Sequence, residues 1–502
     1  MRDALNRTAT RAPRRLRAAP MALALAAALL AGCTVGPPHA RPDVALPGEF
    51  DQASAVQTAG APGAAVWRAF DDPRLDALLA RTLAANTTIA QADARLAETR
   101  ALAGLSVFAL FPTVTAAASG SRSRPSGDDP FVPPGLGSIE TYSAGFDASW
   151  ELDLFGSLRN QSRAIRARAE ANAAELQAVR LSMVAETAQA YFALRGAQRR
   201  EALARENLAA ADEVLRVIEV LFENGRQNGV DFARARAQRD ALAANLPQRE
   251  AERVAQEQRL AALTAQPVAD VRERVGADGP FPALPELVAT GTPQDWLQRR
   301  PDIAAAERRL KASRNDVGEE IAEFFPKLFL NGAFGWTGQA ADALGDSGAE
   351  RWQWGPSLTW RFLDVGRVRQ NVKAAEARAD GAEAAYRETV LRALEETENA
   401  LAGYRASNRA ATELERAAAA AKDASRLARL RFEAGEDDAL SLLQTEQTRI
   451  DLEDAAVQAQ TARTTALAAL YKAVAGDFAE GAGAREGTDA TASASTPERA
   501  AR

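Results

Sequence analysis

Three carboxylates that could do chemistry stand close together in the first half of the chain: Asp147, Glu151 and Asp153. Glycoside hydrolysis requires a pair of carboxylates, so these residues suggest one possible enzyme activity. They all occupy odd-numbered positions, and alternate positions of a strand share one face. A polar face that borders water explains them without catalysis. We therefore expect no enzyme, and we predict that these three residues and Arg361 face a water-filled lumen.

Other residue types that support catalysis are scarce. His39 is the only histidine, and Met183 is the only methionine after residue 32. Copper and zinc sites use imidazole, thiolate or thioether ligands, which this chain barely offers. The sequence also contains no GxxxxGK[ST] loop and no strand–helix GxGxxG motif for a nucleotide. We expect no metal, no cofactor and no nucleotide hydrolysis.

The start of the chain carries a targeting signal. Several arginines precede an apolar run, Met21 to Leu30, which is too short to span a bilayer but suits a signal peptide. The run leads into Leu-Ala-Gly-Cys33, which resembles the lipobox of bacterial lipoproteins. We predict a signal peptide over 1–32 and a diacylglycerol on the thiol of Cys33, with Thr34 favouring the outer membrane. The alternative is a chance cysteine at the end of a signal or membrane helix.

The composition favours a folded, helix-rich chain. The 502 residues are 47% hydrophobic and 25% charged, and aromatic residues make up only 6%. Abundant alanine with few aromatic residues favours long helices over an all-β body. The formal net charge of -6 gives no basic excess, so nucleic acid is not an expected partner.

The sequence repeats itself at an offset of 210 residues. Trp150-Glu-Leu-Asp-Leu-Phe-Gly156 lies over Trp360-Arg-Phe-Leu-Asp-Val-Gly366, and Leu221-Phe-Glu-Asn-Gly225 lies over Arg431-Phe-Glu-Ala-Gly435. A constant offset over this distance indicates an internal two-fold repeat. We expect a lipidated N-terminal segment at 33–66, a first structural repeat at 67–290, a second at 291–474 and a disordered tail at 475–502.

Each copy is expected to form a helix, a strand, a loop, a second strand, a very long helix, a turn and a last helix. The long segments, Leu158–Glu223 and Arg367–Glu433, contain no proline and would each be roughly 100 Å long. Glycine should end each of them, which leaves turns at Asn224–Asp231 and Ala434–Ser441. A coiled-coil rod would also have such helices. That alternative leaves the strands unexplained.

Four segments alternate between apolar and polar residues, and we expect strands at about 113–121, 141–154, 327–337 and 352–363. In the second, Tyr142, Phe146 and Trp150 share one parity, opposite small or polar residues. No stretch after Cys33 is long and apolar enough for a membrane helix, so any spanning part must be a β-barrel. Alternation with clustered tryptophans is typical of membrane strands, although a half-buried soluble hairpin alternates too.

A barrel of this kind would need more than one chain. The smallest membrane barrels have about eight strands, and an open edge in lipid leaves backbone groups unpaired. Two copies of a four-stranded chain would supply eight strands, and three copies would supply twelve. The pattern of residues by itself leaves both numbers open.

Longer motifs resemble the outer-membrane factor (TolC-like) family, in its OprM/NodT-type lipoprotein branch. The resemblance extends from Cys33 to about Val474 and rests on Trp67-Arg-Ala-Phe-Asp-Asp-Pro, on the Trp150 motif and on Arg300-Pro-Asp-Ile. It implies a homotrimer with a twelve-stranded β-barrel, four strands per chain, continuous with a long periplasmic α-helical barrel. It also implies a passive conduit of a tripartite efflux pump, with a membrane-fusion adaptor and an inner-membrane RND transporter as partners.

The resemblance further implies an acidic gate at the periplasmic turns. Asp231 matches one family position, whereas Ser441 and Gln444 are neutral where the family has carboxylates. Asp437 and Asp438 lie nearby, so we predict a gate formed by Asp231, Asp437 and Asp438. The alternative is that these residues only cap helices and solvate the turns.

Two other functions remain open at this stage. An outer-membrane component of a protein-secretion system can use the same architecture. A structural periplasmic coiled-coil lipoprotein would explain the anchor and the helices without a pore.

Overall fold

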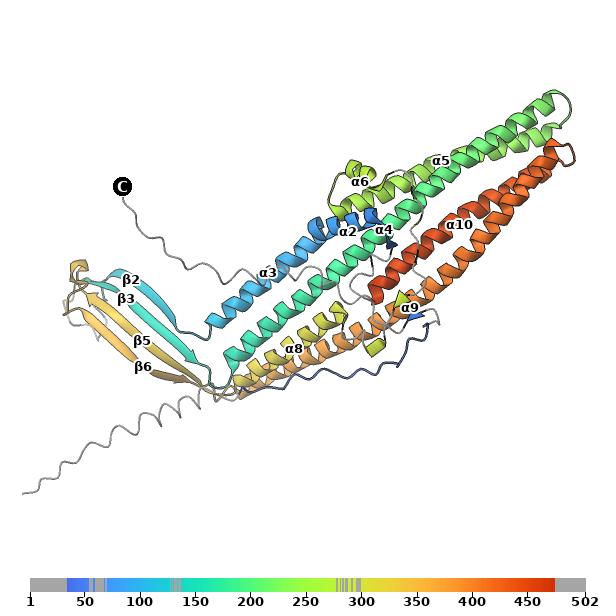
Figure 1. Ribbon diagram of the computed structural model, residues 1–502. Helices are drawn as coiled ribbons and strands as arrows, with labels where there is room; N and C mark the ends of the chain where they lie inside the picture. The colour runs from blue at the N-terminus through green and yellow to red at the C-terminus, as the bar shows by residue number, and fades with distance from the viewer. Residues whose placement is uncertain are drawn as a thin grey trace, which may run out of the picture. The chain divides into compact units, whose positions relative to one another are not determined.

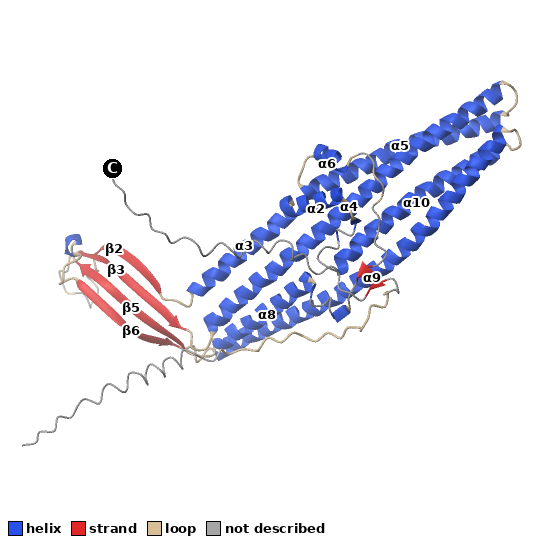
Figure 2. Cartoon of the chain, viewed as in Figure 1, coloured by secondary structure: helices blue, strands red, loops and turns tan. Residues whose placement is uncertain are grey.

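The computed structural model describes residues 34–474, except for short gaps (Figure 1, Figure 2). The gaps are 54–56, 59–66, 68–69, 127, 129, 131–132, 134–136, 277–278, 280, 282–283, 285–287, 290–291 and 295–298. The predicted signal peptide (1–32), Cys33 and the tail (475–502) lie outside the described residues. Within the described part, no helix combines the length and the apolar composition needed to cross a membrane.

The described chain is mostly helical, with one four-stranded sheet. Its helices are α2 (Pro73–Ala85), α3 (Thr87–Phe108), α4 (Ser157–Glu223), α5 (Gly229–Thr264), α6 (Val268–Val275), α8 (Pro301–Ala322), α9 (Val365–Glu433), α10 (Ala439–Val474) and the 3-10 turn η3 (Ala341–Ala343). Its strands are β1 (Gln57–Thr58), β2 (Thr113–Ser123), β3 (Ile139–Leu152), β4 (Val288–Ala289), β5 (Lys327–Gly338) and β6 (Glu350–Thr359).

The internal repeat is confirmed by the order of the elements. The series α3, β2, β3, α4, α5 recurs as α8, β5, β6, α9, α10. The long helices α4 and α9 have 67 and 69 residues, and α5 and α10 have 36 residues each. The two copies therefore differ little in the lengths of their main helices.

Both long helices end in the way that the glycines predict. Gly225 and Gly435 adopt φ values of 69° and 73°, a left-handed conformation that glycine adopts without strain. The N–H of the residue after each glycine donates to a carbonyl five residues back, at 2.8 Å in the first copy and 2.9 Å in the second. This is the Schellman arrangement that stops a helix and reverses the chain.

The chain forms two compact units, and each unit combines stretches of both copies. The first unit contains 34–42, Ala97–Glu170 and Glu307–Ala385, and therefore holds the whole four-stranded sheet. The sheet is antiparallel in the order β2, β3, β5, β6. The two hairpins of the two copies thus pair through β3 and β5, at Trp150 opposite Leu330 for example.

The second unit contains 43–96, Ala171–Ala306 and 386–474, and holds the main apolar core. Phe70 packs against Phe192 of α4 at 4.8 Å between ring centroids and against Tyr471 of α10 at 5.6 Å. Trp67 meets Tyr471 edge-on at 6.0 Å. The Trp67 motif therefore joins helices from both copies, and burying these large rings stabilises the unit.

The Arg300 motif has a matching role in the same unit. Arg300 is buried, binds Asp302 and Glu396 at 2.7 Å each, and donates to the carbonyl of Ala473 near the end of α10. In the first copy Asn86 donates instead to the carbonyl of Leu263 near the end of α5, at 2.8 Å. The positions 263 and 473 are 210 residues apart. Each copy thus ties the start of its entering helix to the end of its last helix.

Two strands end earlier than the sequence indicates. β3 ends at Leu152 rather than at 154, because Asp153 accepts hydrogen bonds from the backbone N–H and Nε of Arg159 at 2.9 and 3.1 Å. β6 ends at Thr359 rather than at 363, because a turn closed by the bond from the N–H of Asp364 to the carbonyl of Arg361 leads into α9. In both places local polar bonds replace the ladder.

Candidate functional site

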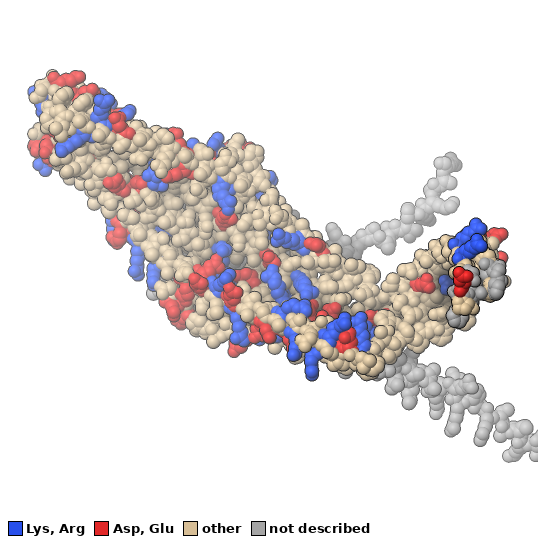
Figure 3. All heavy atoms as spheres, turned by 180° about the vertical axis from the view of Figure 1, so that it is seen from behind, with Lys and Arg blue, Asp and Glu red and all other residues tan. Residues whose placement is uncertain are grey.

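The sheet presents one face made almost entirely of apolar residues. Side chains along this face are exposed in the chain, and Trp352, Trp354 and Phe146 reach 68%, 74% and 53% exposure. Other exposed members are Val114, Leu330, Phe334 and Leu358. In Figure 3 the sheet shows few charged side chains between its ends, whereas the helices carry charges of both signs. An exposed apolar surface of this kind marks contact with lipid or with another protein.

The opposite face is polar and internally hydrogen-bonded. Ser149 donates to Asn331 at 2.9 Å, and Asn331 donates to Ser357 at 2.8 Å, so one polar ladder crosses β3, β5 and β6. Ser119 and Ser143 bond at 2.8 Å between β2 and β3. Apart from Phe329, which pairs with Glu151 and Ser357, the pairing register places small or polar residues opposite one another along this face. The sheet can therefore separate water from an apolar medium.

The four predicted lumen residues divide into two pairs. Asp147 and Glu151 lie on β3, on the same face as the polar ladder. Asp153 and Arg361 lie beyond the ends of β3 and β6, so the parity that assigned them to the lumen does not apply to them. The Asp153 side chain is only 9% exposed, because it pairs with Arg159.

Each hairpin is fastened to the helix that enters it by a tryptophan. The indole N–H of Trp150 donates to the carbonyl of Leu110 at 2.9 Å, and that of Trp360 donates to the carbonyl of Phe324 at 3.0 Å. Both carbonyls stand two residues before the proline that follows the entering helix. The bond also satisfies the polar N–H of an otherwise apolar ring. The repeated tryptophan motif is therefore explained by this bond.

The outer strands of the described sheet, β2 and β6, each pair on one side only. β2 has 11 residues and β6 has 10, so both edges are long. Long open edges are templates for pairing with further strands. The structural coiled-coil lipoprotein is a poor description of this chain, because a rod has no need of such a sheet.

The three predicted gate residues, called the tip aspartates from here on (Asp231, Asp437 and Asp438), all lie at the starts of α5 and α10. Asp231 is buried and accepts a hydrogen bond from the side chain of Asn228 at 2.7 Å. Asp438 accepts from the N–H of Ser441 at 2.8 Å, and Asp437 accepts from its hydroxyl at 3.2 Å. Asp438 thus caps the start of α10, whereas the N-cap of α5 is Asn228, whose side chain accepts from the N–H of Asp231 at 3.0 Å.

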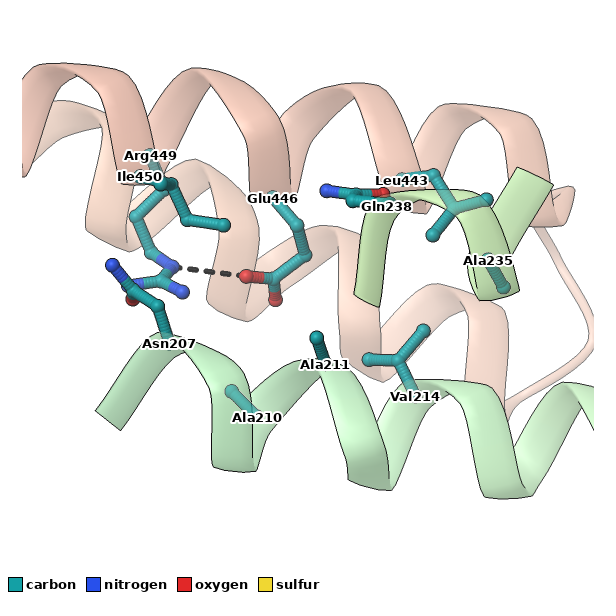
Figure 4. Close-up of a pocket in the computed structure, with 10 residues that line it drawn as sticks. All are labelled: Asn207, Ala210, Ala211, Val214, Ala235, Gln238, Leu443, Glu446, Arg449 and Ile450. Carbon is teal, nitrogen blue, oxygen red and sulfur yellow. Dashed lines mark hydrogen bonds and ion pairs between the residues drawn. The ribbon is translucent and has the colours of Figure 1, made fainter. Parts of the chain in front are cut away.

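A buried carboxylate that the sequence analysis missed lies near the same end of α10. Glu446 accepts hydrogen bonds from Ser425 and Arg429 of α9 and from Arg449, at 2.8 to 3.0 Å. Burial alone would raise the pKa of Glu446, but these hydrogen bonds outweigh it and hold that pKa below its ordinary value. Figure 4 shows Glu446 pointing from α10 toward α4, with Arg449 bonded to it. Arg449 recurs in the first copy as Arg239, 210 residues earlier. This repeated arginine was the one sequence feature that could have pointed to the partners of Glu446.

Sequence comparison identifies the family. The profile described as "Outer membrane efflux protein" matches residues 78–266 and 292–476, one stretch in each copy. Outer membrane protein OprJ of Pseudomonas aeruginosa is 31% identical over 468 residues, which cover 91% of this chain and 95% of OprJ. Nodulation protein T of Rhizobium leguminosarum bv. trifolii is 27% identical, over 84% of this chain and 89% of its own length.

Solved structures share the fold. The outer-membrane channel OprN aligns with a TM-score of 0.84 and 37% identity, over 89% of this chain and all of that one. The open state of the Neisseria gonorrhoeae MtrE outer membrane channel aligns with a TM-score of 0.79 and 29% identity, over 89% of this chain and 98% of MtrE. The predicted fold class and the outer-membrane location are confirmed. The chain belongs to the outer membrane efflux protein family and is an outer-membrane channel protein of an efflux pump.

Proposed function

We propose that three copies of this chain close one twelve-stranded barrel, through which small molecules leave the cell without any chemical step. One observation carries the proposal: the sheet has an exposed apolar face, a hydroxyl-rich polar face and two long open edges. Unpaired edge groups in lipid cost several kcal/mol each, so β2 of one copy must pair with β6 of another. Three copies, rather than two, follow from the resemblance to outer-membrane factors.

The long helices supply the second part of the conduit. Helices of 67 and 69 residues are about 100 Å long, several times the roughly 30 Å hydrocarbon thickness of a bilayer. Such helices extend far into the periplasm. There they meet a membrane-fusion adaptor and an inner-membrane RND transporter. The name of TtgC from Pseudomonas putida, a probable efflux pump outer membrane protein that is 27% identical over 92% of this chain, supports this assignment.

Three further parts of the proposal concern single residues. Cys33 carries the lipid anchor. Asp147 and Glu151 face the lumen together with the polar ladder of Ser149, Asn331 and Ser357. The tip aspartates, which lie at the starts of α5 and α10, contribute negative charge to the narrow periplasmic end of the pore and favour cations there.

Cysteine pairs across the seam test the assembly. Ala117→Cys on β2 is combined in turn with Arg351→Cys, Gln353→Cys and Gly355→Cys on β6, all on the polar face. Because Cys33 is the only native cysteine, oxidation should yield covalent trimers for at least one pair. The matched control joins Ser119→Cys and Ser143→Cys, direct partners within one chain, and should remain monomeric. Covalent products no larger than a dimer, or none from any pair, would refute the shared barrel.

A further inference from the structure

The first described residues of the chain are held by specific contacts with other parts of the protein, and two glycines make these contacts possible. The N–H of Val35 donates to the carbonyl of Phe155 at 3.2 Å, and the side chain of Asn160 donates to the carbonyl of Val35 at 2.8 Å. These partners belong to the turn between β3 and α4 and to the first turn of α4. A segment of chain with both peptide groups of one residue bonded in this way has a defined position.

Two glycines make room for this segment. Gly318 lies inside α8, where glycine costs about 1 kcal/mol relative to alanine. A Cβ on Gly318 would come within 2.5 Å of Asn160 Nδ2 and 2.9 Å of the Val35 carbonyl oxygen. A Cβ on Gly36 would come within 2.7 Å of the Gly318 Cα, and Gly36 has a φ of 133°. The close approach of the two backbones therefore explains a helix glycine that helix propensity disfavours.

The contacts continue along α8. The carbonyl of Ala40 accepts a hydrogen bond from Arg314, and Glu307 binds both His39 and Arg41 at 3.7 Å. The segment thus runs antiparallel to α8, with Gly36 at Gly318 and with His39 and Arg41 at Glu307. We call residues 34–41 the strap. Its contacts join it to α4, to α8 and to the turn between β3 and α4.

His39 makes the strap sensitive to its charge. Burial, followed by the positive charge of Arg314, lowers the pKa of His39, and Lys311 lowers it further. Glu307 acts in the opposite direction through its hydrogen bond and charge. Burial and the two cations win, so the docked strap prefers neutral His39.

We propose that the strap binds in a fixed position and thereby holds the acylated end of the chain beside the turn between β3 and α4. Thr34 already lies against this turn: a Cβ on Gly156 would come within 3.1 Å of the Thr34 Cα. Consecutive Cα atoms are about 3.8 Å apart, so a docked Thr34 limits how far from this turn an acyl group on the preceding residue can reach. This inference rests on the proposed lipid anchor.

Protease cleavage of the full-length, detergent-purified protein tests the inference. The intact mass before digestion shows whether Cys33 carries acyl chains. During digestion with proteinase K, loss of the acylated N-terminal peptide from the protein shows that the strap has been cleaved. Gly36→Ala leaves the sequence of the helices unchanged and should speed this cleavage about tenfold, because the new Cβ would clash with the backbone of Gly318. Gly48→Ala is the matched control, since no atom lies within 4 Å of its Cβ, and should cleave like the native chain.

A second variant tests the residue of α4 that binds the strap. Asn160→Ala removes the bond to Val35 without adding atoms and should speed cleavage about fivefold. Native cleavage as fast as that of Gly36→Ala, with the acyl mass present, would overturn the strap and leave the lipid anchor intact. A free thiol at Cys33 would overturn the anchor, and with it the positioning role, even if the strap were protected.

Discussion

Replacing Gly196 with alanine should weaken the packing of α4 against α10, although alanine is the better helix former. Gly196 is buried, and a Cβ there would lie 2.7 Å from Cγ2 of Thr461 and closer still to its Oγ1. Overpacking of this kind costs about 1–3 kcal/mol, against a gain of about 1 kcal/mol in helix propensity. The net effect is a loss of roughly 0–2 kcal/mol.

Gly403 of α9 provides the matched control. It is exposed and has no atom within 4 Å of its Cβ, so Gly403→Ala should gain about 1 kcal/mol. The two alanine variants are compared by thermal unfolding in one detergent and at one scan rate, because unfolding of such a protein is governed by rate. Gly196→Ala should unfold at the lower temperature. Adding Thr461→Ala to Gly196→Ala should restore the unfolding temperature, because the side chain that clashes with the new Cβ is removed. Equal midpoints for the two glycine variants would contradict the packing argument.

Three further predictions concern the membrane face, the tip and the strap. Trp354→Arg, on the exposed apolar face, should cost about 2–4 kcal/mol of membrane stability, whereas Gln353→Arg on the polar face should insert normally, as judged by heat-modifiable migration in outer-membrane fractions. Changing all three tip aspartates to asparagine should reduce cation selectivity in single-channel recordings, and an unchanged reversal potential would leave them as turn and cap residues only. Because the pKa of His39 is lowered, docking of the strap is strongest above pH 6.5 and weakens as pH falls through the folded-state pKa. Strap cleavage should therefore accelerate near pH 5, and His39→Gln should abolish this acceleration.

Much of the fold could be predicted from the sequence, because the repeat shows the sequence pattern of each main helix and strand twice. The positions of α4, α9 and all four sheet strands follow from periodicity, from proline and from glycine. The ends of β3 and β6 do not, since they depend on which local polar group captures the chain, as Asp153 does with Arg159. Periodicity indicates which residues share a face, but it does not show where a ladder stops.

The site was predictable in its faces and less so in its contacts. Asp147 falls on the polar face, as its parity indicates. The partners of Glu446, by contrast, come from two helices, and those of Val35 are more than 100 residues away in sequence. The strap was missed for the same reason: Gly318 appears in the sequence only as an unexplained glycine in a helix. Its meaning depends on Asn160 and Val35, which no local pattern connects to it.

The mass of the detergent-purified particle tests the central claim most directly. Light scattering corrected for bound detergent gives the number of protein chains per particle. A sheet with two open edges requires other copies, and the resemblance to outer-membrane factors sets their number, so we predict three chains, which together supply twelve strands. A stable particle with a single chain would contradict the shared barrel, and with it the conduit that depends on it.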